Sequence, residues 1–326
     1  MAIIDFHNHV YPPEYVEEIQ KGPSAYQVTF DADDNPILHS PGDYNILVPG
    51  HRLMDYRKTV LEKAGIDRQV ISFTAPGTLI ETPERSVELS RKVNDIFANI
   101  QKEHSDSFIA LATLPLNDPD ASVSELEYAI SKLELKGATL FSNANGVALS
   151  DRRFWPLYEK ANELHLVIFI HPTYPIGVET MTEYMLMPLV GFLADTTLAA
   201  ASLVFSGAVE KFPNIKWVLG HLGGAVPYLA ERFDRGYEAF EQCRKNIKKP
   251  PSEYLKNFYY DTVNFDVKAL QFAIDFAGAE HLLAGSDYPH QIGSLEKMLA
   301  SIGQLNITSE EKAGILGKNA ARLLGI

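Results

Sequence analysis

The chain has 326 residues, 46% of them hydrophobic and 22% charged, which is enough to bury the core of one large α/β domain or two small ones. Its formal net charge of −13 argues against nucleic acid or an anionic membrane as a partner, because phosphate binding needs clustered Lys and Arg. One cysteine, Cys243, excludes an internal disulfide and a cysteine-built zinc site. We see neither a membrane-spanning apolar stretch nor a signal-peptide pattern, and therefore expect a cytoplasmic protein.

The first ten residues combine a short apolar run with two histidines. Residues 2–4 predict a buried strand, and His7 and His9 follow it two residues apart. Alternate side chains of a strand share a face, so both imidazoles can point toward one ion. Neutral imidazole is a common zinc ligand, although such a pair also occurs on polar strand faces without a metal.

Residues 11–56 contain many prolines, glycines and aspartates and show no regular period. We expect an irregular segment here. A stretch of this length inside a compact domain is often a functional cover or an insertion.

From residue 57 onward, helical patterns alternate with short apolar strands. The predicted strands cover residues 69–74, 108–112, 137–141, 166–170, 215–220, 258–261 and 281–285. The predicted helices cover residues 57–64, 83–104, 118–133, 152–164, 189–212, 225–246, 266–276, 295–302 and 309–324.

With the N-terminal strand, this pattern predicts a closed parallel (β/α)₈ barrel of the α/β class, because strands buried on both faces read as apolar runs. We expect one domain over residues 1–326, with insertions at about 11–56 after the first strand and about 172–187 after the fifth. An open doubly wound sheet is the alternative, but no glycine-rich phosphate loop follows the first strand.

Polar side chains follow several predicted strands at the end where a barrel carries its active site. His7 and His9 end the first strand, His171 the fifth, His221 the sixth and Asp287 the eighth. Taken alone, each of these residues could have a purely structural role as a turn residue, a core histidine or a helix cap. Their common placement at one rim favours a site for a divalent ion with nitrogen and oxygen ligands.

Several separate motifs carry a family resemblance. They are His7-x-His9, the segments 61–67 and 198–212, Gly220-His-Leu-Gly-Gly, Pro250-Pro-Ser-Glu-Tyr and Gly285-Ser-Asp-Tyr-Pro. Together they resemble the amidohydrolase superfamily over nearly the whole chain. The resemblance is to its second branch, which includes the α-amino-β-carboxymuconate-ε-semialdehyde and hydroxybenzoate (γ-resorcylate-type) decarboxylases.

This resemblance implies one zinc ion, with manganese possible, and a dimer or dimer-based assembly. Its metal ligands would be His7, His9, His171 and Asp287, and His221 would act with Asp287 in catalysis as the acid/base. The carboxylated lysine of binuclear relatives has no counterpart, since Phe141-Ser142 ends the fourth strand. The implied reaction is non-oxidative removal of CO₂ from an unsaturated acid.

The chain also departs from the family. Ile46 stands where the semialdehyde decarboxylases have a carboxylate-binding arginine, and Arg52 or His51 is a candidate replacement. His290 replaces a phenylalanine after Asp-Tyr-Pro, and Arg232 matches an arginine that reaches a neighbouring subunit's site. The candidate substrate contacts are therefore Arg232, His290, Arg52 and Tyr174.

We accordingly expect a metal-dependent decarboxylase of a small aromatic or dienoic carboxylic acid. The alternatives are a hydrolase of a lactone or amide, or a hydratase, because the same metal and histidine serve those reactions. A barrel that has lost its activity and serves as a binding protein is a third possibility, but no site residue is missing.

Overall fold

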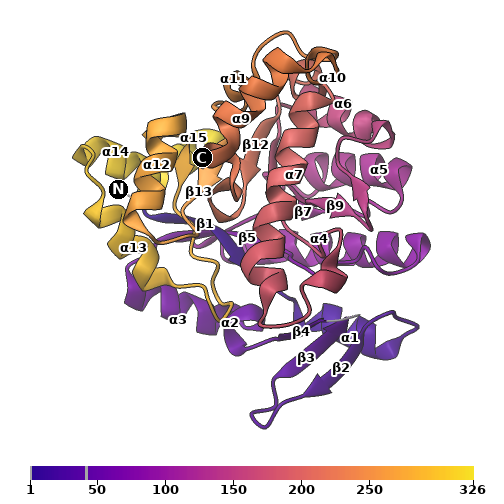
Figure 1. Cartoon of the computed structure of the whole chain (residues 1–326). Helices are drawn as coiled ribbons and strands as arrows, with labels where there is room; N and C mark the ends of the chain where they lie inside the picture. The colour runs from indigo at the N-terminus through magenta and orange to yellow at the C-terminus, as the bar shows by residue number, and fades with distance from the viewer. Residues whose placement is uncertain (1, 41–42) are drawn as a thin grey trace.

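A computed structural model describes residues 2–40 and 43–326 of the chain and shows a closed barrel of parallel strands surrounded by helices (Figure 1). Hydrogen bonds join the strands in the orders β1-β5-β6 and β7-β8-β11-β12-β13-β14, where β6 and β7 are two parts of one strand. The barrel closes between its first and last strands. Phe6 N donates to Ala284 O at 2.7 Å, and Asn8 forms an isolated parallel β-bridge with Tyr288. The strands are β1 (Ile4–His9), β5 (Arg68–Ser72), β6 (Phe108–Ala110), β7 (Ala112–Thr113), β8 (Gly137–Phe141), β11 (Val167–His171), β12 (Lys216–Leu219), β13 (Tyr259–Asp261) and β14 (Leu282–Leu283). The predicted (β/α)₈ architecture is confirmed.

A ring of helices covers the outer face of these strands (Figure 1). Several begin at a side chain that accepts a hydrogen bond from the first turn: Thr82, Asp118, Asp266 and Ser294. The longer helices are α3 (Met54–Ala64), α4 (Pro83–Glu103), α5 (Pro119–Ser131), α6 (Trp155–Glu163), α7 (Phe192–Phe205), α9 (Val226–Ala239), α12 (Val267–Ala277) and α13 (Leu295–Gln304). Short helices are α8 (Ala208–Lys211), α10 (Glu241–Arg244), α11 (Pro251–Leu255), α14 (Ser309–Ala313) and α15 (Asn319–Leu324).

Three long predicted helices are interrupted in the structure. The segment 189–212 consists of a π-helical turn at Met187–Gly191, α7 and α8, with Gly207 in the left-handed region between the two helices (φ 84°). The segment 225–246 divides at Phe240, which has extended dihedrals, and a π-helical turn at Gly314–Lys318 separates α14 from α15. Apolar periodicity alone does not reveal such local breaks.

The segment 11–56 is more regular than predicted. It contains α1 (Pro13–Lys21), α2 (Pro49–Arg52) and an antiparallel sheet of β2 (Gln27–Phe30), β3 (Pro36–Ser40) and β4 (Asp43–Ile46). This sheet extends from the lower side of the barrel in Figure 1. The expectation of an irregular segment was wrong because Pro13 and Pro49 occupy first helical turns, where proline starts a helix rather than breaking it.

The barrel interior has its own apolar cluster, which includes Phe6, Val70 and Phe169. Ala320 and Leu324 of α15 belong to this cluster together with Ile4 near the start of β1, so the last helix closes the N-terminal end of the barrel. The polar side chains lie at the opposite end, where the strands terminate, for example His9, His171 and Asp261.

One helical stretch, Met187–Phe205, is long and apolar enough to span a membrane by length and composition. The expectation that no such stretch exists was therefore wrong. In the structure this stretch includes α7, a helix of the barrel's outer ring that packs against α11 and α9, and 44% of it is buried. The rest of the stretch is partly or fully exposed on the outside of the barrel, including Leu189, Val190 and Leu198.

Candidate metal centre

The two N-terminal histidines reach the barrel interior through an irregularity in β1. The pairing of β1 with β5 shifts register between Asp5 and Asn8, so Phe6 and His7, although adjacent, both pack against Phe169. A bulge of this kind redirects a side chain at a barrel rim. His7 and His9 nevertheless point to the same place as predicted, with their Nε2 atoms 3.0 Å apart, whereas Asn8 donates to Val70 O.

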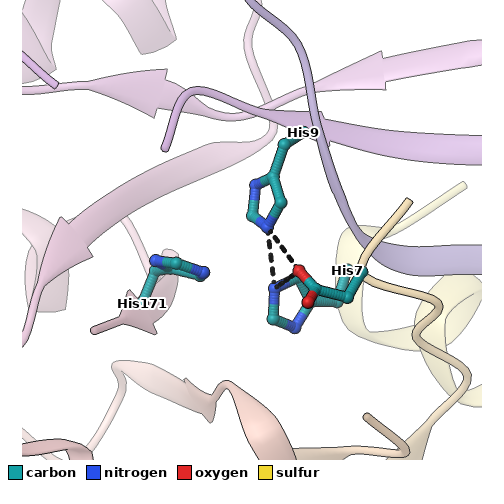
Figure 2. Close-up of side chains that lie close together, drawn as sticks. His7, His9 and His171 are labelled. Atoms are coloured by element: carbon teal, nitrogen blue, oxygen red, sulfur yellow. Dashed lines mark hydrogen bonds and ion pairs between the residues drawn. The ribbon is translucent and has the colours of Figure 1, made fainter. Parts of the chain in front are cut away.

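Four side chains converge above Phe169, at the end of the barrel where the strands terminate. His7, His9, His171 and Asp287 are all buried, and their ligand atoms lie within 4.8 Å of one another. His9 Nε2 is 3.0 Å from both His7 Nε2 and Asp287 Oδ1. Figure 2 shows the rings of His7 and His9 joined by a dashed line and the ring of His171 beside them. His171 Nε2 is buried with no hydrogen-bond partner among the described residues. Two facing imidazole nitrogens, a carboxylate and an unpaired third nitrogen fit a divalent cation. These four residues form a metal site.

The far side of each imidazole is held by the protein. His7 Nδ1 bonds to the Asp261 carboxylate, and His9 Nδ1 lies 3.4 Å from Ser72 Oγ. His171 Nδ1 is 2.8 Å from Pro172 O. Because each Nδ1 faces a protein partner, each Nε2 remains to face the common centre, which is how ligand histidines are usually oriented.

Burial also favours the metal-binding form of two of the ligands, His9 and His171. Desolvation, together with neighbouring histidines, holds the pKa of His9 and of His171 well below the usual 6.5. A neutral imidazole has the lone pair that a metal requires.

His221 lies beside the donor set without belonging to it. Its Nε2 is 3.9 Å from Asp287 Oδ2, and its ring centroid is 4.9 Å from that of His7. Its backbone is left-handed (φ 53°), as are those of Leu222 and the two glycines that follow. Position 224 requires glycine, because its φ is positive and a Cβ there would overlap the Leu193 carbonyl.

Asp261, at the end of β13, was missed by the sequence analysis. It is fully buried, and besides His7 it accepts the backbone N–H groups of His221 and Leu222 at 2.9 Å each. Burial opposes ionisation, but His7 and these hydrogen bonds hold the pKa of the carboxyl below its usual value. Asp261 ends the seventh strand, so the strand-end rule that selected the other residues also applies to it.

Of the four candidate substrate contacts, His290 packs against the donor set. The ring centroid of His290 is 4.8 Å from that of His9. Arg52 instead donates to Leu47 O at 2.6 Å and to Asn35 Oδ1 at 3.3 Å, so its guanidinium belongs to the insertion. Arg232 is exposed on α9, and Tyr174 is partly buried on the loop that follows His171.

Comparisons with known proteins identify the family and the fold. The family model described as Amidohydrolase matches residues 4–326. The chain is 33% identical over 277 residues to a 2-amino-3-carboxymuconate-6-semialdehyde decarboxylase of Dictyostelium discoideum, covering 83% of this chain and 76% of that protein. A 5-carboxyvanillate decarboxylase from Sphingomonas paucimobilis matches with a TM-score of 0.86 and 25% identity, covering 100% and 99% of the two chains. A dihydroxybenzoic acid decarboxylase from Polaromonas sp. JS666, solved with manganese and 2-nitroresorcinol, matches with a TM-score of 0.83 and 24% identity, covering 99% and 97%.

Proposed function

This chain belongs to the amidohydrolase family, and we propose from that premise that it is a metal-dependent, non-oxidative decarboxylase of a small aromatic or muconate-type carboxylic acid. The observation that carries the proposal is the convergence of three imidazoles and one carboxylate within 4.8 Å at the carboxyl ends of the strands. Similarity to decarboxylases over most of the chain supports the type of reaction. The expected alternatives, hydrolase and hydratase, have no observation of their own in their favour.

The bound ion is proposed to be a single zinc. Three nitrogens and one carboxylate oxygen are typical zinc ligands, and manganese is the second candidate because the Polaromonas protein was solved with it. When bound, a divalent cation supplies positive charge that stabilises the negative charge developing as the C–C bond breaks.

His221 is proposed to be the catalytic acid. As the bond to the carboxylate breaks, CO₂ leaves and the electron pair stays on the substrate carbon. A proton from His221 Nε2 then forms the new C–H bond, and solvent returns a proton to the imidazole. The position of this nitrogen, 3.9 Å from Asp287 Oδ2 but outside the donor set, supports the role. Asp287 then serves both as a ligand and as the neighbour of the acid.

The test is to incubate metal-loaded protein with a panel of hydroxybenzoates and muconate semialdehydes and to measure CO₂ release. We expect CO₂ together with the product protonated at the carbon that carried the carboxylate. Ring-opened or hydrolysed products without CO₂ would reject the proposal.

Three further properties are proposed with this function. The whole of residues 1–326 acts as one catalytic domain covered by the insertions at 11–56 and 172–187, and the protein is cytoplasmic. We also propose a homodimer in which Arg232, exposed on α9, reaches the partner's substrate. Sedimentation analysis tests the homodimer, and the effect of R232A on KM tests the role of Arg232.

A further inference from the structure

Two histidines outside the donor set form a pair beside it. His290 lies on the loop after β14, with its ring centroid 4.8 Å from that of His9. His51 lies in α2 of the first insertion, with its ring centroid 5.2 Å from that of His290. The backbone of Gly50 packs so closely on Tyr288 that a Cβ would overlap its ring. The first insertion therefore packs directly against the loop that carries His290.

His51 has unsatisfied hydrogen-bonding capacity. Its side chain is 2% exposed, and neither ring nitrogen has a hydrogen-bond partner among the described residues. A buried polar group without a partner destabilises the folded state, so such a group in a native protein needs an explanation. Burial, with His290 and two nearby arginines, holds the pKa of His51 well below 6.5. The uncharged ring therefore offers one donor and one acceptor.

The two arginines near His51 are already engaged by the protein. Arg57 is fully buried and donates to Gln69 Oε1, Asn8 Oδ1 and the carbonyls of His9 and Gly50. Arg52 donates to Leu47 O and Asn35 Oδ1. Neither guanidinium is presented to a ligand beside His51, so a carboxylate placed there would lose its hydration without gaining an ion pair.

The pair and the proposed acid occupy different flanks of the donor set. The ring of His221 lies against His7 and His171, at centroid distances of 4.9 and 5.3 Å. The ring contacts of His290 are with His9 and His51. A substrate seated on the donor set therefore meets the acid on one side and the histidine pair on the other.

We propose that His51 and His290 form a specificity subsite that hydrogen-bonds an uncharged polar substituent of the substrate, namely a ring hydroxyl, and that disfavours a second carboxylate at the same position. This inference rests on the proposed decarboxylase function and narrows its substrate to hydroxylated monocarboxylic acids. A hydroxyl between the two rings donates to one imidazole and accepts from the other, which satisfies one of the two His51 nitrogens that have no partner among the described residues. Sites built to bond a substrate hydroxyl discriminate strongly against analogues that lack it.

The experiment uses three benzoates that differ only at one ring position, which bears a hydroxyl, a hydrogen or a carboxylate. kcat/KM for CO₂ release is measured with metal-loaded wild type, H51F, H290F and H290Q. A nitro analogue that cannot be decarboxylated provides dissociation constants with and without the hydroxyl. H104Q is the matched control, because His104 caps the end of α4 just before β6 and so lies at the opposite end of the barrel.

We expect wild type and H104Q to prefer the hydroxyl compound by about 10- to 100-fold over the hydrogen analogue and to use the dicarboxylate least. H51F and H290F should lose most of this preference, whereas H290Q should keep part of it because an amide also donates and accepts. His290 is only partly buried, so H290F carries the test whether or not H51F folds.

An unchanged preference in H290F, or a wild type that uses the dicarboxylate as well as the hydroxyl compound, would overturn the subsite while leaving the decarboxylase assignment intact. CO₂ release from none of the benzoates or muconate semialdehydes would instead reject the proposed function, and the subsite with it.

Discussion

The carboxylate of Asp261 is hydrogen-bonded to Nδ1 of His7, a residue 254 positions away in the chain. The same carboxylate accepts the backbone N–H groups that begin the left-handed turn of His221 and Leu222. One buried side chain thus orients a metal ligand and also holds the segment that carries the proposed acid. It is a positioning residue for both.

Replacing Asp261 with Asn should weaken metal binding. An amide does not carry the negative charge that orients the His7 ring and raises its basicity, and loss of such a partner typically costs about 10- to 100-fold in metal affinity. Competition with a chelator, followed by metal analysis, measures the change. D266N is the matched control, because the exposed Asp266 side chain caps α12 and Asn caps equally well. Equal affinities in the two variants would contradict the role of Asp261.

Removing one ligand should abolish stable metal binding. His171 contributes the only ligand from β11, and its Nε2 has no other partner in the described structure. We expect H171A to fall from about one ion per chain to nearly none after dialysis. An unchanged metal content would mean that the coordination scheme is wrong.

Substitution of His221 should separate chemistry from metal binding. Asn is the best choice because it tolerates the left-handed backbone found at this position (φ 53°). We expect H221N to keep its metal and to lose about 10²- to 10⁴-fold in kcat, the usual contribution of a general acid. Metal loss together with activity would instead place His221 among the ligands.

Glu125, buried in α5, should make folding stability depend on pH. Burial raises its pKa above the usual 4.5, although Asn94 and Arg91 donate hydrogen bonds to it. The carboxyl binds its proton more tightly in the folded state than in the unfolded state. Its contribution to the free energy of unfolding is therefore fully present below about pH 4.5 and is lost as the pH rises through the folded-state pKa.

Urea unfolding of wild type and E125Q at about pH 4.5 and about pH 7.5 measures this effect. Wild type should lose stability relative to E125Q at the higher pH. A difference that does not change with pH would show that the folded protein does not shift this carboxyl.

Local patterns were sufficient to predict the barrel and to group the polar residues at its strand ends. Apolar runs alternate with amphipathic helices, and parallel strands that close into a barrel place all their carboxyl ends at one rim. His7, His9, His171, His221 and Asp287 could therefore be grouped before any distance was known, and the family resemblance divided them into four ligands and one acid/base. Asp261 obeys the same rule but was not predicted.

The sequence by itself determined the order of strands and helices and the residue types at the strand ends, since these follow from periodicity within short windows. Only the tertiary structure decided which side chains outside that rule reach the site. Arg52 and His51 are neighbours in the chain, yet one bonds within the insertion and the other packs against His290. That choice depends on how the insertion packs on the loop after β14, a contact between segments more than two hundred residues apart that no local pattern encodes.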